Sequence, residues 1–193
     1  MVMDKRIFII AALACSSFLP GCCKVEQKRP PVAGSPHGGA VKADEYQAPY
    51  YPGLIEEYKT LLAEDPNNLA AIIAIGNAYF DSGQWKKAIT YYEHALRIDP
   101  RNADVRTDMG TSYRNQGLYE RALAEYRMVL QHEPGHLNAR YNTGVVYAYD
   151  KKDYVTAVHV WEELLRLSPS YPKSGHMRTC IVTFKKVIEK GNQ

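Results

Sequence analysis

Apolar residues recur at helical spacing through the second and third quarters of the chain. Ile72, Ile75, Gly76 and Tyr79 follow an i, i+3, i+4, i+7 pattern, which is typical of one face of an α-helix. After a break at Gly83, a second apolar series consists of Trp85, Ala88, Tyr92 and Ala95. Pro100 ends this series, because proline cannot continue a helix and restricts the residue before it. The pattern therefore predicts two antiparallel helices over residues 69–102.

The same pattern returns at a step of 34 residues. The recurring positions are Gly76, Gly110 and Gly144, and Tyr79, Tyr113 and Tyr147. A second unit thus covers residues 103–136 and a third covers 137–171, in which Ala157, Trp161, Leu164 and Pro169 each arrive one residue late. We expect this extra residue to loosen the turn at residues 150–153. A glycine inside a helix costs about 1 kcal/mol relative to alanine, so its recurrence indicates a packing requirement.

Single helices flank the three units. Residues 50–68 match only the second-helix pattern, through Leu54, Tyr58 and Leu61, and form a half repeat. Residues 172–193 place Met177, Ile181, Phe184 and Ile188 at helical spacing. Arrays of this kind need terminal helices with one polar face, so we expect both segments to be capping helices and the array to contain eight helices.

A period of 34 with these residue types resembles the tetratricopeptide repeat (TPR) family. The resemblance implies an all-α fold, a short α-solenoid of antiparallel helix pairs with capping helices. It also implies protein or peptide binding on the concave face, which the first helix of each unit lines in this family. Carried over to this sequence, the partner-binding residues would be Ile73, Asn77, Phe80, Asp108, Thr111, Arg114, Tyr141, Asn142, Val145 and Tyr149.

Half of these positions are apolar where a solvated face would be polar. We therefore expect an exposed apolar strip formed by Ile73, Phe80, Tyr141, Val145 and Tyr149. The alternative is that some of these side chains pack against a neighbouring repeat or cap, Phe80 and Tyr149 above all. A clamp for a C-terminal carboxylate, known in chaperone-binding members, is not favoured. Asn77 alone fits that clamp, because its cationic positions hold Ile73, Asn138 and Asn142, and Asp104 and Asp108 would repel a carboxylate.

The N-terminus has the pattern of a bacterial lipoprotein signal. Lys5 and Arg6 precede an apolar run, residues 7–19, that is too short to cross a bilayer. The following Leu-Pro-Gly-Cys resembles the lipobox, which implies a signal peptide over residues 1–21 and lipidation of Cys22. A rival site at Cys15 lacks a leucine three residues before the cysteine. An ordinary cleaved secretory signal or an uncleaved anchor are the alternatives.

The segment that follows predicts a tether and a location. Residues 22–49 are rich in Pro, Gly and charge, which predicts a disordered tether. Cys23, rather than an aspartate, follows the lipobox cysteine. By resemblance to sorted lipoproteins, this favours the periplasmic face of the outer membrane in the bacterial cell envelope.

Composition and spacing argue against several other function classes. A formal net charge of +3 is too small to favour nucleic acid. No pair of the four cysteines has C-x-x-C spacing, and Pro134 and Gly135 separate His132 from His136, so we expect no metal site. Cys180 lies among apolar residues and is interpreted as a small core residue. No arrangement of catalytic residues is present, so we expect no enzyme, no cofactor and no small-molecule substrate.

These observations predict a membrane-tethered, non-enzymatic scaffold or adaptor in the bacterial cell envelope, which binds a protein or peptide partner in its groove. Two alternatives stay open. One is an assembly factor for an outer-membrane, pilus or secretion complex, which could act by stacking its own caps. The other is an accessory subunit of an envelope enzyme.

Overall fold

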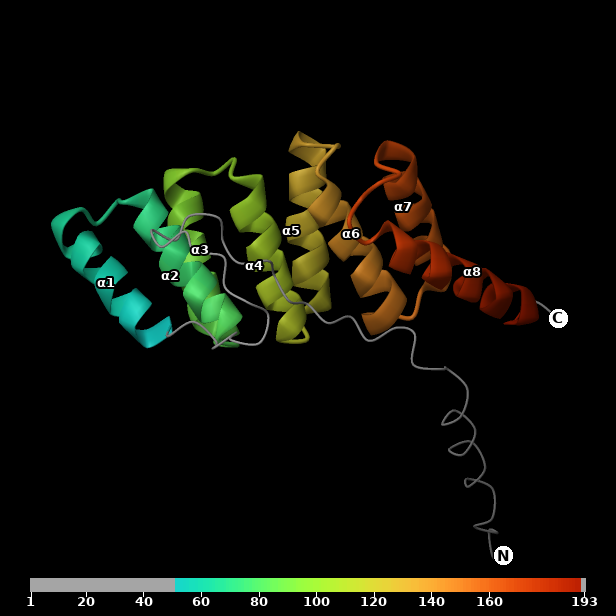
Figure 1. The fold of residues 1–193 in the computed structure, drawn as a ribbon, viewed down its shortest axis with the longest axis horizontal. Coiled ribbons are helices and arrows are strands. Elements are labelled where there is room, and N and C mark those ends of the chain that lie inside the picture. Colours follow the sequence, from blue (N-terminus) through green and yellow to red (C-terminus); the bar gives the residue numbers. More distant parts are fainter. Residues whose placement is uncertain (1–50, 192–193) are drawn as a thin grey trace, which may run out of the picture. The chain divides into compact units, whose positions relative to one another are not determined.

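The computed structural model describes residues 51–191, and these form helices joined by short turns (Figure 1). The predicted all-α fold is confirmed over this part of the chain. The predicted signal peptide, the tether and Cys22 lie outside the described residues. The elements are α1 (Tyr51–Glu64), α2 (Leu69–Asp81), α3 (Trp85–Ile98), α4 (Ala103–Asn115), α5 (Tyr119–His132), α6 (Leu137–Val145), η2 (Val146–Asp150), α7 (Tyr154–Leu167) and α8 (Ser174–Gly191).

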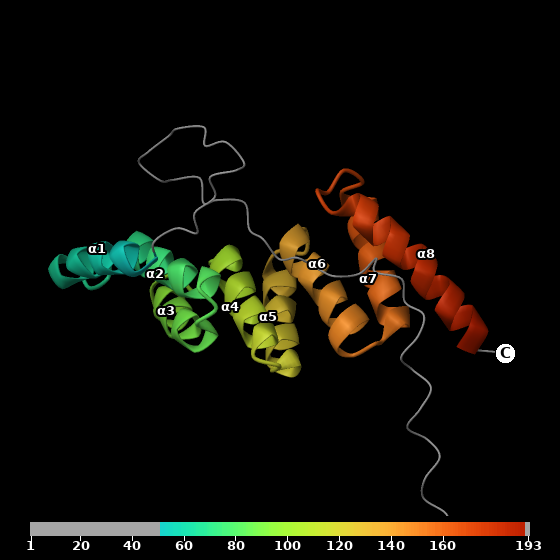
Figure 2. The same ribbon diagram turned by 60° about the horizontal axis from the view of Figure 1, so that its bottom comes forward.

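Each helix packs on the helix that follows it in the chain. The extensive contacts are α2 on α3, α4 on α5 and α6 on α7 within the three units. Between units, α1 packs on α2, α3 on α4, α5 on α6 and α7 on α8, and Figures 1 and 2 show this succession. Because the loops are short, neighbouring helices run antiparallel. The arrangement is that of an α-solenoid, and α1 and α8 each have one sequence neighbour to pack on among the described helices.

The turns between units repeat one capping device at the 34-residue step. Asn68, Asn102 and His136 each stand immediately before a first helix. The side chain of each accepts the N–H of the residue three positions later, at 3.1, 3.0 and 3.1 Å respectively. A side-chain acceptor at this position satisfies one of the otherwise unbonded N–H groups of the first turn. The same device therefore fixes the start of α2, α4 and α6.

The turns within the first two units depend on a glycine in the left-handed region. Gly83 has φ of 74° and Gly117 has φ of 77°. Each turn closes with an N–H that donates to the carbonyl of the unit's recurring tyrosine, from Gln84 to Tyr79 at 2.8 Å and from Leu118 to Tyr113 at 2.9 Å. Glycine adopts positive φ without steric cost, which accounts for its place here.

The third unit absorbs its extra residue inside the helix, so the expected looser turn is wrong. α6 continues into the π-helix η2, in which Lys151 N–H donates to the carbonyl of Val146, five residues back. The turn then closes as in the other units, because Asp153 N–H donates to Tyr147 O at 2.8 Å and Lys152 takes φ of 56°. Counting back from Asp153 and the positive-φ residue Lys152, which match Gln84 and Gly83, Ala148 is the additional residue. Tyr149 therefore occupies the place of Phe80 and Arg114 in the earlier units.

The recurring glycines make room for an aromatic ring of the second helix. A methyl group placed on Gly76 would lie 2.8 Å from the Tyr92 ring, and one on Gly110 would lie 2.6 Å from Tyr126. At Gly144 the nearest atom is Nε1 of Trp161, at 2.2 Å. The predicted packing requirement is confirmed, and its cause is ring-to-backbone contact within each pair.

Each terminal helix buries apolar side chains against the unit beside it. Ile55 of α1 is buried against the first unit, whose core includes Ile72 and Tyr79. In α8, Met177, Cys180, Ile181 and Phe184 are buried. The prediction that Cys180 is a core residue is confirmed, since the side chain is inaccessible to solvent.

Candidate partner-binding face

The first helices α2, α4 and α6, the last with its continuation η2, carry the residues predicted to bind a partner, and we refer to their common side as the first-helix face. The expected exposed apolar strip is wrong for three of its members. Phe80 is 8% exposed, Tyr141 is 2% exposed and Val145 has no exposed surface. Only Ile73 and Tyr149 are partly accessible. A partner therefore meets little apolar surface on this face.

Aromatic neighbours cover these apolar side chains. The Phe80 ring meets Trp85 edge-on, with 5.3 Å between centroids. Tyr141 lies 6.1 Å from Trp161 and 5.7 Å from Tyr171, and the Lys173 Nζ lies 4.6 Å from the Tyr141 ring centroid. This burial raises the pKa of the Tyr141 hydroxyl to about 12.

Tyr149 turns toward α8 because the insertion at η2 moves it by one helical position. Its ring lies 6.2 Å from Trp161 and 6.4 Å from Phe184. Its hydroxyl lies 3.2 Å from Nε2 of His176 and 3.4 Å from Sγ of Cys180. The alternative stated for Tyr149, packing against a cap, is the arrangement that the structure shows.

Polar residues of the first-helix face bond to one another across the units. Thr111 Oγ1 lies 3.1 Å from the hydroxyl of Tyr126, and Asn142 donates to Thr111 at 3.2 Å from the next unit. The equivalent of Thr111 in the first unit is Asn77, which accepts the hydroxyl of Tyr92 at 2.8 Å. Burial raises the pKa of the Tyr126 hydroxyl, so the hydroxyl keeps its proton and can donate it in the hydrogen bond with Thr111. These contacts hold α4, α5 and α6 together and orient the amide of Asn142.

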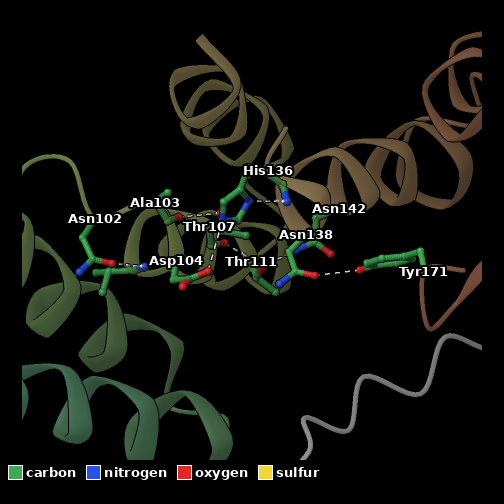
Figure 3. A network of polar contacts seen from close by, with 11 residues as sticks. Asn102, Ala103, Asp104, Thr107, Thr111, His136, Asn138, Asn142 and Tyr171 are labelled. Atoms are coloured by element: carbon green, nitrogen blue, oxygen red, sulfur yellow. Dashed lines mark hydrogen bonds and ion pairs between the residues drawn. The ribbon is translucent and has the colours of Figure 1, made fainter. Parts of the chain in front are cut away.

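His136 connects the cap of α6 to α4, as Figure 3 shows. Its Nδ1 accepts the N–H of Ala139, so a neutral ring carries its proton on Nε2. That nitrogen lies 3.2 Å from Oδ1 of Asp104 and can donate to it. The histidine therefore positions an exposed carboxylate on the first-helix face.

Arg114 is already paired. Its Nε lies 2.5 Å from Oδ2 of Asp150 and its terminal nitrogen lies 3.2 Å from Oδ1. Both side chains are 14% exposed. The insertion at η2 brings Asp150 into this bidentate contact, and the pairing neutralises the cation that was expected to meet a partner.

A shallow depression of about 500 Å³ opens beside Asn138, where the α5–α6 turn meets the α7–α8 loop. Asn138 accepts the hydroxyl of Tyr171 at 2.9 Å, a contact drawn in Figure 3, and its own NH₂ group is left to donate elsewhere. Burial raises the pKa of Tyr171 to about 12, so the donor keeps its proton. The depression is lined by Glu133, Gly135, His136, Leu137, Asn138, Tyr171 and Pro172.

The accessible part of the first-helix face is thus polar and rich in carboxylates and amides. Its exposed or partly exposed polar members are Asn77, Asp81, Asp104, Asp108, Arg114, Asn115, Asn138 and Asn142, and its accessible apolar or aromatic members are Ala70, Ile73, Ala74 and Tyr149. Sequence reasoning missed the contributions of Tyr171 and Lys173, in the loop between α7 and α8, and of His176 in α8. It also missed the capping role of His136, although Asn68 and Asn102 give the same position at the same step.

The face has no arrangement that indicates catalysis. Cys180 lies 3.5 Å from Nε2 of His176, but its side chain is inaccessible to a substrate. Within residues 51–191, no group of three metal-ligating side chains is placed to hold a metal ion. The same part of the chain contains no helix that is both long and apolar enough to cross a membrane.

Two family models match the repeated region. Residues 76–117 match a TPR repeat model, and residues 107–172 match a tetratricopeptide repeat model. The chain contains tetratricopeptide repeats. TPR repeats typically act as non-catalytic modules that bind protein or peptide partners, so a protein-binding scaffold fits this chain.

Solved structures share the TPR fold. A crystal structure of MamA superposes with a TM-score of 0.59 at 22% identity, covering 74% of this chain and 89% of MamA. The Sgt2 TPR domain from Aspergillus fumigatus superposes with a TM-score of 0.57 at 25% identity, covering 64% of this chain and 81% of that domain. No curated protein sequence matches the chain.

Proposed function

We propose that this TPR protein is a membrane-tethered, non-enzymatic scaffold that binds a polar segment of a protein partner along the first-helix face. The observation that supports the face is its accessible set of amides and carboxylates, which lies between buried aromatic residues. Amide side chains can donate to and accept from an extended peptide backbone. Arg114 is neutralised by Asp150, whereas the carboxylate of Asp104 is largely exposed, so the partner segment in this proposal offers N–H donors or basic side chains.

Site-specific photocrosslinking tests this proposal. A photoreactive residue at Asn138 replaces an exposed side chain beside the depression, and a matched one at Arg127 lies exposed on a second helix. We expect partner adducts from position 138 and not from 127. We expect Asp104→Lys to reduce the adduct at 138, since it reverses a charge on the same face without touching the core. Equal adducts from both positions, or an adduct that Asp104→Lys leaves unchanged, would contradict the proposal.

The membrane tether is the second component, and the lipobox-like sequence before Cys22 supports it. In this proposal a lipid on Cys22 holds the repeats at the periplasmic face of the outer membrane. Several acyl chains on one residue give stable anchoring where a single chain gives reversible binding. We expect Cys22→Ser to move the protein from the membrane fraction to the soluble fraction and to abolish incorporation of a labelled fatty acid. Cys15→Ser and Cys23→Ser serve as controls, and membrane retention of Cys22→Ser would refute the tether.

A further inference from the structure

Within residues 51–191, the first and last helices of the array each lack the partner that the equivalent helix has in a complete unit. α1 follows the second-helix pattern, and α8 packs on α7 as α4 packs on α3 and α6 on α5. Among the described residues, no first helix precedes α1 and no second helix follows α8. From these two unpaired faces we infer that copies of this chain associate end to end, with α1 of one copy packed on α8 of the next.

The exposed side of α1 can be read from the complete units. Leu54 and Leu61 occupy the positions of Ala88 and Ala95, which are fully buried against the first helix of their own pair. In α1 these leucines are 37% and 42% exposed. Tyr58, at the position of the buried Tyr92, is only half-buried. A face that is core in every other unit is therefore accessible here, and its side chains are larger.

α8 presents a matching exposed side. Val182 is 55% exposed and lies midway between the exposed Arg178 and Lys186, four residues to either side. The buried residues of α8, among them Met177, Cys180 and Phe184, face the core. An apolar centre with basic flanks therefore faces away from α7.

The two helices have net charges of opposite sign. α1 carries three glutamates and one lysine, whereas α8 carries four basic residues and one glutamate. On α1, Glu57 lies between Leu54 and Leu61 at helical spacing, and Glu64 follows on the same side. Faces of like charge would repel, so contacts between the α1 helices of two copies, or between their α8 helices, are disfavoured. The complementarity selects a contact between the two different ends.

A contact between different surfaces continues from copy to copy unless the rotation closes a ring. We therefore expect a concentration-dependent series of oligomers rather than a single dimer. The contact involves only about one helix from each copy, so it is weak and weakens further as salt screens the charges. This inference does not depend on the first-helix face, and its failure would leave the proposed partner binding unaffected.

Charge exchange tests the contact on the full chain. One variant carries Glu57→Lys and Glu64→Lys on α1, and the other carries Arg178→Glu and Lys186→Glu on α8. Differently tagged copies are purified, mixed and captured through one tag. We expect each variant to capture its own kind at least tenfold less than wild type, because its two ends then repel. A mixture of the two variants should recover capture, since each α1 again meets an α8 of opposite charge.

Controls separate this contact from general charge effects and from unfolding. Arg97→Glu with Arg127→Glu reverses two exposed charges on α3 and α5 and should leave capture unchanged. Val182→Asp places a charge at the centre of the α8 face without entering the core and should reduce capture. If another segment of the same chain covers α1, wild-type chains should not capture one another. That result would overturn the inference. Capture that survives either reversal, or mixed variants with native circular dichroism that fail to recover it, would overturn it as well.

Discussion

Gly144→Ala gives the most direct test of the packing between paired helices. The added methyl carbon would lie 2.2 Å from Nε1 and 2.4 Å from Cδ1 of Trp161. Carbon atoms in contact prefer about 3.5–4 Å, so the ring must move by more than about 1 Å. Trp161 is fully buried, and the rings of Tyr141, Tyr149 and Phe184 lie beside it, so its displacement disturbs these neighbours.

The free energy of unfolding should fall by about 1–3 kcal/mol. Overpacking a core costs about 1–3 kcal/mol. Displacement of the ring also weakens the hydrogen bond from Trp161 Nε1 to Tyr141 O, which is 3.1 Å long and contributes about 1 kcal/mol. Against these losses, alanine gains about 1 kcal/mol over glycine in helix propensity. The steric cost and the lost bond together exceed the gain.

Urea unfolding followed by circular dichroism measures this change as a lower midpoint at unchanged slope. Gly175→Ala is the matched control, because no atom lies within 4 Å of its added methyl group, and it should be neutral or slightly stabilising. Gly76→Ala and Gly110→Ala have longer contacts, at 2.8 and 2.6 Å, and should cost less than Gly144→Ala. A Gly144→Ala protein at least as stable as wild type would refute the steric reasoning.

Three further predictions concern the third unit and the elements packed against it. Asp150→Asn and Arg114→Ala should each lower the free energy of unfolding by about 1–3 kcal/mol, because each leaves a largely buried charge without its partner. A double-mutant cycle measured by urea unfolding should show coupling between the two residues, and additive losses would contradict this pairing. Lys152→Gly should raise the thermal midpoint through a gain of about 1 kcal/mol, because φ of 56° is unfavourable for lysine, and a lowered midpoint would argue against this. Burial, and secondarily the charge of Lys173, lowers the pKa of His176 below its ordinary value of 6.5. Between that lowered pKa and about pH 6.5, the unfolded chain binds more protons than the folded chain, so the free energy of unfolding should rise with pH. His176→Gln should flatten this pH dependence in thermal melts, and an unchanged slope would show that other groups cause it.

The helix pairs could be predicted from the sequence because each unit repeats the same local pattern. Gly76, Gly110 and Gly144 indicated a packing requirement, and the structure identifies the ring that each accommodates. The burial of Tyr141 could not be predicted in this way. It depends on Tyr171 and Lys173, which lie in the loop between α7 and α8, where the apolar pattern of the helices gives no information.

The position of the extra residue in the third unit was equally inaccessible to sequence reasoning. One additional residue between Tyr147 and Asp153 can be placed in the turn or in the helix, and the apolar pattern is the same in both cases. The backbone hydrogen bonds decide in favour of the helix. As a result, Tyr149 and Asp150 each lie one position from where a constant period would put them. The residues expected on the first-helix face were therefore misassigned at this point.

The π-helix at Val146–Asp150 shows how this array tolerates a change in length. Because the additional residue widens one helical turn, the closing bond from Asp153 to Tyr147 is kept and α7 meets α6 as in the other units. The helix pairs therefore pack regularly although the third unit is one residue longer than the others. A search that demands a constant 34-residue spacing would undercount the units of such a protein. Deletion of Ala148 should yield a chain whose three units are equal in length, with a plain α-helix in place of the widened turn.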